Sequence, residues 1–383
     1  MLLTEGVGYD SEGQGLESYL SDELCMSESS VKRVKGSSPF LFQLPLSKVQ
    51  AVVSYLRGLL SEGGFGADDC NRILGKIVLA HPSLMHLSVE TNLQPRLNFL
   101  RTACQLDDKD MATLIKASSG ILGLSVEDNL KPTLEFLTDL LQTPDPLTNV
   151  QQLLRKCIKS HPNILALSLQ NLASKVEYFN SLGGGSTAAE VSLASRIAMR
   201  APVVFSLSLQ DNIVPTVEFL AKVWGLTSGE VLLSHWLGES PAVLTLSLEG
   251  NIQPTMDFYN RTGYTQLGND WILKEGGRVI RGRYIAASLF NRLLPRWHYL
   301  LQQQEKQQQQ QQQREVPLEE EEEETTLDMP PIYILVGASD DSFCEVYGFD
   351  QLDYSRFRSE SAPRLKFSSQ FDTWLKTGRA IEV

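Results

Sequence analysis

One motif recurs along the whole chain, and this repetition constrains the fold more than any other feature of the sequence. A clear copy reads "HPSLMHLSVETNLQPRLNFL", and another reads "APVVFSLSLQDNIVPTVEFL". Both contain two prolines within an otherwise helix-like pattern of apolar residues. Clear copies begin at His81, Ser118, Ala201 and Ser240, altered copies begin at His161 and Arg281, and an eroded copy begins at Ser38.

The repeat has a nearly constant period. A serine shared by the copies occurs at Ser88, Ser125, Ser168, Ser208, Ser247 and Ser288, which gives intervals of 37, 43, 40, 39 and 41 residues. Self-similarity at such a period is typical of a solenoid, in which each unit buries its apolar face against its neighbours. The sequence therefore predicts a stacked array rather than one globular core.

Each copy reads as two helices joined by a tight corner. The stretch "RILGKIVLA" has apolar residues at helix spacing and is predicted to form a first helix, helix A, that ends at Pro82. Ser88 is predicted to cap a short turn and Asn92 to cap the next helix, helix B. Pro95 then lies in the first turn of helix B, where it costs no internal hydrogen bond.

Some copies depart from this pattern without changing the period. Ser119 replaces the first proline of the second copy, and Gly282 replaces that of the last. The third copy has lost one residue and carries Ser174 in place of its second proline. The fold class is therefore predicted to be all-α, a helical-repeat solenoid.

The composition divides the chain into four regions. Residues 1–37 are rich in Ser and Gly and contain seven acidic residues before Lys32, which predicts a disordered N-terminus. Residues 38–300 hold the repeats. Residues 301–329 contain a glutamine tract and an acidic block and are predicted to be a low-complexity linker. Residues 330–383 regain apolar residues and predict a small C-terminal element.

The sequence offers little for catalysis, membrane insertion or disulfide bonding. No apolar stretch is long enough to span a bilayer, and Cys25, Cys70, Cys104, Cys157 and Cys344 are scattered, as in a protein from a reducing compartment. His81 and His86 lack the spacing of a zinc motif, and the glycine-rich stretch before Lys76 fails as a phosphate loop. We therefore expect neither enzymatic activity nor a metal or other cofactor.

Charge is unevenly distributed along the chain. The net charge is −12, but residues 71–300 carry 21 basic and 19 acidic residues, so the excess acid lies in the flanks. Basic residues recur in the predicted A helices at spacings that share one helix face, and a row of cations suits a phosphate backbone. The candidate nucleic-acid-binding residues are Arg72, Lys76, Lys109, Lys116, Arg155, Lys156, Lys159, Arg196, Arg200, Lys274, Arg278, Arg281, Arg283, Arg292 and Arg296.

The repeat "PxxLxLSLxxNLxPxxxFL", the terminal "SLFNRLLPR" and the closing "GASDDSFCEVYGF" resemble the mitochondrial transcription termination factor (mTERF) family. The resemblance covers roughly residues 38–300, with a further match near 330–360. It implies a superhelix whose concave basic side grips double-stranded nucleic acid in mitochondria or chloroplasts. It also implies a role in transcription termination or a related step of transcript regulation, with the chain acting as a monomer.

Two other functions fit a helical-repeat array. The first is a protein-binding scaffold, which an apolar rather than basic groove would favour. The second is an organellar RNA-binding or ribosome-assembly factor. The acidic start of the sequence lacks the arginine-rich pattern of a transit peptide, so the organellar location rests on the resemblance alone.

Overall fold

A computed structural model describes residues 10–182, 191–261, 271–274, 277–280, 282–312 and 332–367. The chain folds as a helical-repeat protein, and most of the described part is helical. It consists of two compact units, Met1–Ser206 (unit 1) and Leu207–Val383 (unit 2). The predicted all-α repeat architecture is confirmed, although it is divided between two units.

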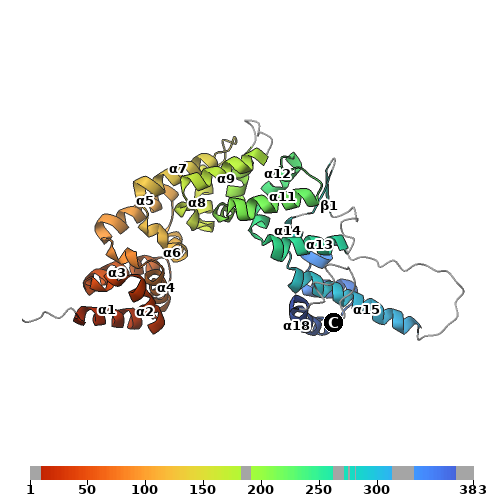
Figure 1. The fold of residues 1–383 in the computed structure, drawn as a ribbon, viewed down its shortest axis with the longest axis horizontal. Coiled ribbons are helices and arrows are strands. Elements are labelled where there is room, and N and C mark those ends of the chain that lie inside the picture. The colour runs from red at the N-terminus through yellow and green to blue at the C-terminus, as the bar shows by residue number, and fades with distance from the viewer. Residues whose placement is uncertain are drawn as a thin grey trace, which may run out of the picture. The chain divides into compact units, whose positions relative to one another are not determined.

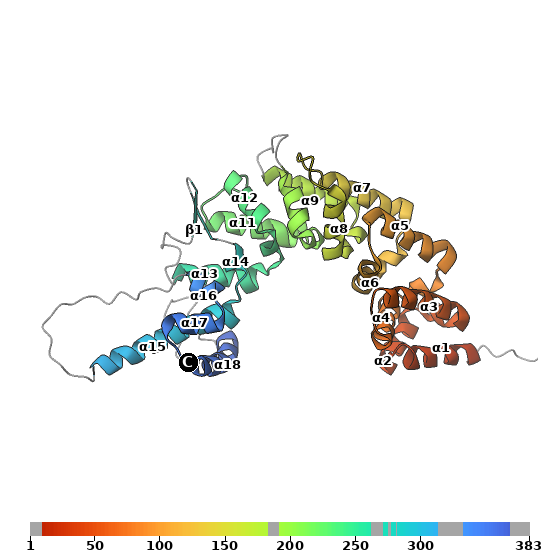
Figure 2. The ribbon, with the colours of Figure 1, turned by 180° about the vertical axis from the view of Figure 1, so that it is seen from behind.

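Unit 1 contains two rows of helices. The second helices of its repeats, α5, α7 and α9, run along one side of this unit, and the first helices α6 and α8 run along the other (Figure 1). The view from behind shows the same separation (Figure 2). The bounds are α1 Asp10–Asp22, α2 Glu28–Ser37, α3 Leu46–Glu62, α4 Ala67–Ala80, α5 Gln94–Cys104, α6 Asp108–Ala117, α7 Lys131–Leu140, α8 Val150–Ser160, α9 Leu169–Leu182 and α10 Leu193–Arg200.

A short 3₁₀ turn follows each A helix of unit 1 and forms the first half of the corner. Proline is the first residue of most of these turns, where it stops the preceding helix without removing a needed donor. Successive turns contact one another, and their apolar residues, such as Leu84 and Met85, are buried. The turns are Pro39–Gln43, Pro82–His86, Ser119–Gly123, Pro162–Ala166 and Pro202–Ser206.

The shared serine begins the second half of the corner. The Ser88 hydroxyl accepts a hydrogen bond from the Thr91 amide at 3.2 Å, as predicted for a cap, and the other five serines accept the equivalent bond. Asn92 does not cap helix B as predicted. Its side-chain oxygen instead accepts from the Ser88 amide at 3.1 Å, so Asn92 holds the backbone of the serine that caps the turn.

Between the serine and helix B, five of the repeats contain a widened π turn. In the first of them, Val89–Leu93, the Leu93 amide donates to the Ser88 carbonyl at 3.1 Å, five residues back instead of four. A π turn accommodates one extra residue in a helix. The other π turns are Val126–Leu130, Leu209–Ile213, Leu248–Ile252 and Leu289–Leu293.

The third repeat lacks this turn because it lacks the extra residue. In this repeat the Leu172 amide donates to the Ser168 carbonyl at 3.0 Å, four residues back, and α9 begins directly at Leu169. Leu172 is nevertheless as fully buried as Leu93, its counterpart in a repeat with a π turn. The missing residue therefore changes the helical winding but keeps the same side chain in the core.

The residue after the second proline, or after its substitute, is polar and buried in each repeat that has the shared serine. Where this residue is long and charged, it donates to the corner of the next repeat. The Arg96 guanidinium donates to the Leu122 carbonyl, and the Lys175 ammonium donates to the Phe205 carbonyl at 2.6 Å. These buried bonds connect consecutive repeats. The buried polar residues that follow the second proline or its substitute are Arg96, Thr133, Lys175, Thr216, Thr255 and Arg296.

Unit 2 continues the repeats, but its last A helix is largely replaced by strands. Trp271 pairs with Ile280 and Lys274 with Gly277 in an antiparallel hairpin, which leads to the short helix α14. The elements are α11 Val214–Val223, α12 Val231–Glu239, a 3₁₀ turn Pro241–Thr245, α13 Gln253–Arg261, β1 Trp271–Lys274, β2 Gly277–Ile280, α14 Gly282–Ile285, α15 Leu294–Gln312, α16 Ile332–Gly337, α17 Asp340–Tyr347 and α18 Gln351–Phe367.

The domain boundaries predicted at both ends are corrected by the structure. Residues 10–37 form α1 and α2, whose Leu16, Leu20 and Val34 are fully buried, so most of the predicted disordered region is folded. At the other end, α15 extends to Gln312 and includes most of the glutamine tract assigned to the linker. The C-terminal element contacts α15 and belongs to unit 2. The remainder of the predicted linker, residues 313–329, lies outside the described residues.

Candidate nucleic-acid interface

The A helices of unit 1 share one exposed face. The positions ten, six and three residues before the first residue of each 3₁₀ turn fall on the same side of a helix. None of them is buried in α4, α6, α8 and α10, and none holds Asp or Glu. These positions, which we call the helix A face, are Arg72, Lys76 and Leu79; Lys109, Thr113 and Lys116; Gln152, Lys156 and Lys159; Ser192, Arg196 and Met199.

The A helices α4 and α6 border a groove of about 490 Å³, the α4–α6 groove. Lys76 of α4 and Lys116 of α6 line it, together with His81, Ser118 and Asn163. The Lys116 ammonium also lies 4.9 Å from the centre of the Phe65 ring. No carboxylate lines this groove, so its two ammonium groups produce a positive potential that no neighbouring lining residue cancels.

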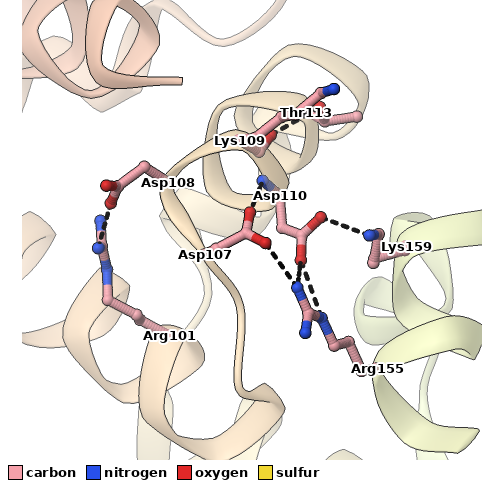
Figure 3. Close-up of polar contacts among 8 residues, drawn as sticks. All are labelled: Arg101, Asp107, Asp108, Lys109, Asp110, Thr113, Arg155 and Lys159. Carbon is pink, nitrogen blue, oxygen red and sulfur yellow. Dashed lines mark hydrogen bonds and ion pairs between the residues drawn. The ribbon is translucent and has the colours of Figure 1, made fainter. Parts of the chain in front are cut away.

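The next groove, between α6 and α8, has a different charge. It is smaller, about 240 Å³, and is lined by Lys109 and Lys159 but also by Asp107 and Asp110. The Lys109 ammonium is directed away from the cluster formed by both carboxylates and Lys159 (Figure 3). The α6–α8 groove therefore combines cations and anions, unlike the α4–α6 groove.

Asp110 is the centre of this cluster. Its carboxylate is 5% exposed and lies 2.6 Å from the Lys159 ammonium. Arg155 donates to the same carboxylate through Nε at 2.9 Å and Nη2 at 2.5 Å, and Nη2 also lies 2.6 Å from Asp107 (Figure 3). Two predicted phosphate-binding residues, Arg155 and Lys159, are thus paired with carboxylates of the preceding repeat.

The same contacts determine the ionisation of Asp110. Burial raises the pKa of its carboxyl, but the hydrogen bonds and charges of Lys159 and Arg155 outweigh burial and leave the pKa below its ordinary value. A carboxyl with a lowered folded-state pKa stabilises the protein above its unfolded pKa of about 3.9. That contribution is lost as the pH falls through the lower folded value.

Asp110→Asn is therefore expected to destabilise unit 1 by about 1–2 kcal/mol at pH 7, because it removes charge-assisted hydrogen bonds at a buried acceptor. The difference in unfolding free energy between this variant and the unsubstituted chain should shrink as the pH falls below about 4. Urea denaturation of the full chain at pH 7 and pH 3, followed by circular dichroism, measures both effects. The matched control is Asp108→Asn. Asp108 is exposed and its partner Arg101 is half-exposed, so the expected loss of unfolding free energy is about 0.5 kcal/mol or less. Equal losses for the two variants would contradict the role given to Asp110.

The remaining predicted cations of unit 1 are exposed or half-exposed. Arg72 pairs with Asp69 at 2.9 Å within its own helix, and both side chains are exposed. Lys76, Lys109 and Lys156 form no ion pair within the described part of the chain. Arg196 is half-exposed on the helix A face, while Arg200 is exposed at the end of α10.

The predicted cations of unit 2 do not form a comparable row. Lys274 and Arg278 lie on the two strands of the hairpin, so the helix spacing that grouped them does not apply. Arg283 is exposed and lies over the Tyr284 ring, and Arg292 donates to the Val336 carbonyl at 2.9 Å. Arg281 lies outside the described residues.

Arg296 corrects the prediction most clearly. Its side chain is 0% exposed, and its guanidinium donates to the carbonyls of Ile334, Leu335 and Ala338 and to the Asp340 carboxylate. It occupies the same buried position as Arg96 and Lys175 in earlier repeats. A phosphate cannot reach it in this arrangement, so the prediction of a nucleic-acid contact is wrong for Arg296.

Comparison with known proteins agrees with the repeat architecture. The family model described as mTERF matches residues 18–272, which include α2, α3 and the repeats up to the hairpin. The chain belongs to the mTERF family. A search of the curated proteins finds no match. The mTERF match begins within α1, in the region for which sequence analysis predicted disorder.

mTERF proteins are helical-repeat proteins that bind nucleic acid, regulate gene expression, and are typically organellar and generally non-enzymatic. Within the described residues of this mTERF chain, no three His, Cys, Asp or Glu side chains are grouped as metal ligands would be. No helix in the described ranges has the length and apolar character needed to cross a membrane. The helix A face, with its repeated lysines and arginines, is the candidate site for nucleic acid.

Proposed function

We propose that this mTERF protein binds nucleic acid, double-stranded DNA foremost, through the helix A face of unit 1. Binding would regulate gene expression in a mitochondrion or chloroplast, by transcription termination or a related step. One observation carries the proposal: exposed or half-exposed positions at one-turn spacing on successive A helices hold lysine or arginine repeatedly and hold no carboxylate. Such a row of cations binds phosphates without reading the base sequence.

Within this proposal, the cations are expected to contribute unequally. Lys76 and Lys116 share the α4–α6 groove, where no carboxylate competes with a phosphate. Arg155 and Lys159 are paired with Asp110, so they would have to exchange that partner for a phosphate. The largest contribution to binding by unit 1 is therefore expected from the first pair. The observed basic face also favours nucleic acid over an apolar peptide as the ligand.

The double variant Lys76→Gln/Lys116→Gln is expected to weaken binding of duplex DNA about tenfold at moderate salt. Loss of two phosphate contacts should also reduce the slope of log affinity against log salt concentration by about 2. Fluorescence anisotropy of the full chain, titrated into labelled duplexes at several salt concentrations, measures both quantities. The loss should be similar for unrelated base sequences, because phosphates carry no sequence information.

A second double variant, Lys32→Gln/Lys131→Gln, removes the same charge from exposed lysines outside the helix A face. Its affinity is expected to change less than twofold. Equal weakening by both double variants would mean that net charge, and not the helix A face, drives binding. Salt-insensitive binding, or none to duplex DNA and structured RNA, would refute the proposal, while stronger binding to RNA would redirect it to transcript processing or ribosome assembly.

A further inference from the structure

The α4–α6 groove has more room than a phosphate contact requires. Its volume of about 490 Å³ lies within the range of sites that enclose a small molecule. Surface lysines can bind a phosphodiester from solvent without any cavity. The groove therefore suits a ligand that has a bulky part beside its charged part.

The lining of the groove supplies contacts for both parts. Lys76 of α4 and Lys116 of α6 provide the charges, while Ile73, Ile77 and Ala117 provide apolar surface. At one edge lies the His81 ring, held against the next repeat: a Cβ added to Gly120 would lie 3.1 Å from its Cε1 atom. An imidazole in this setting is a surface on which an unstacked base can pack.

Hydrogen-bonding groups complete the lining. The Ser118 hydroxyl donates to the side-chain oxygen of Asn163, which fixes the Asn163 amide at the groove. The amide nitrogen of Asn163 remains a donor, and a base edge or a ribose presents suitable acceptors. Charged, apolar and hydrogen-bonding groups thus meet in one groove, as recognition of a nucleotide requires.

The α6–α8 groove serves as an internal comparison. It has about half the volume, and Asp107 and Asp110 form part of its lining. A phosphate entering it would meet two carboxylates, one of them buried in an ion-pair cluster. Two neighbouring grooves of the same repeat array therefore differ both in size and in charge.

We propose that the α4–α6 groove binds one unpaired nucleotide of a nucleic-acid strand. The phosphate lies between Lys76 and Lys116, and the base packs on the apolar floor beside His81. This inference rests on the proposed function and adds a preference to it: a duplex that offers an unpaired nucleotide binds better than a perfect duplex. The α6–α8 groove makes no such contact.

The test compares a perfect DNA duplex with the same duplex carrying a single-nucleotide bulge, using the full chain and fluorescence anisotropy. The bulged duplex is expected to bind about tenfold more tightly, within the range that stacking of one base on a protein side chain provides. Ala117→Phe fills the α4–α6 groove without changing its charge, since Ala117 is exposed at the end of α6. This variant should lose the preference, so that its affinities for the two duplexes become equal.

The matched control is Thr113→Phe, which fills the α6–α8 groove and should keep the preference. Equal affinity of the unsubstituted chain for both duplexes would overturn the inference and leave the proposed function standing. A preference that survives Ala117→Phe would also overturn it, because the bulge would then act through bending of the DNA. Absence of binding to either duplex would refute the proposed function as well.

Discussion

Replacing Arg296 with methionine is expected to detach the C-terminal segment Ile332–Tyr347 from the rest of unit 2. The variant should lose about 3–5 kcal/mol of stability. The Arg296 guanidinium is fully buried and donates to Leu335 at 2.8 Å, Ala338 at 2.8 Å and Asp340 at 2.7 Å. It also lies 5.0 Å from the centre of the Phe343 ring. Methionine fills a similar space but removes these bonds, which leaves the Asp340 carboxylate paired with the half-exposed Arg358.

The C-terminal segment depends on this arginine because it imitates the corner of a further repeat. The Arg96 and Lys175 side chains each donate to the carbonyl of the fourth residue of the following turn. Arg296 does the same with Leu335, the fourth residue of α16. Ser339 then caps α17 by accepting from the Ser342 amide at 3.0 Å, as the repeat serines do. The segment therefore closes the array as a final, partial repeat.

Hydrogen exchange measured by mass spectrometry on the full chain tests this prediction. In Arg296→Met, amides of residues 332–347 should lose their protection, whereas those of α11 and α12 should keep theirs. Arg292→Met is the matched control, because Arg292 is exposed and makes one bond to this segment, to Val336 at 2.9 Å. It should cost about 1 kcal/mol or less. Unchanged protection in Arg296→Met would contradict the role of Arg296.

Sequence periodicity was sufficient to predict most of the fold. Pro82 does end helix A, since α4 stops at Ala80, and Ser88 does cap the following turn. These features are local: a proline removes a donor and a serine supplies an acceptor whatever the rest of the chain does. Because every repeat has the same need, repetition of the signal made the prediction robust.

The N-terminal region differs from its prediction because its composition and its apolar spacing point to opposite structures. Residues 10–37 are acidic and contain several serines and glycines, which favoured disorder. Leu16, Leu20 and Leu24 nevertheless recur at four-residue intervals and are buried, as are Val31 and Val34. Their helical spacing was visible in the sequence. The partner surface that buries them, on α3 and α4, was not.

The candidate site was only partly predictable, because the sequence does not say which cations are already paired. Arg155 and Lys159 have the spacing expected for a phosphate-binding face, yet both reach Asp110 in the preceding repeat, 45 residues from Arg155. Arg296 shows the opposite case, a cation taken into the core by backbone carbonyls. The aspartates of "LDDKDM" give the only local hint of the first arrangement, and they read equally well as ordinary N-terminal charges of a helix.

The second large effect is expected from Ser174→Pro in the third repeat, which should destabilise unit 1 by about 3 kcal/mol. The four clear copies of the motif carry proline at this position without harm, and each has a π turn that provides an extra residue between the serine cap and the proline. In the third repeat α9 winds as a regular helix from Leu169. A proline at 174 would remove one helical hydrogen bond, and its ring would collide with the Gln170 carbonyl.

Thermal unfolding of the full-length Ser174→Pro variant, followed by circular dichroism, should show a midpoint temperature about 6–12 °C lower than that of the unsubstituted chain. The control Ser174→Ala removes only the bond from the Ser174 hydroxyl to the Gln170 carbonyl, 2.9 Å long, and should leave the transition nearly unchanged.

Insertion of one aspartate between Gln170 and Asn171 should rescue the proline variant. The combined change gives the sequence Ser-Leu-Gln-Asp-Asn-Leu-Ala-Pro, which matches the fourth repeat in length and in the positions of its cap and proline. The extra residue allows the π turn, and the turn moves the ring away from the carbonyl it would otherwise meet. Two results would contradict this explanation: an insertion that fails to restore the transition temperature, or a Ser174→Pro variant as stable as Ser174→Ala. Either would mean that the extra residue of the π turn is not what allows the other repeats to carry proline.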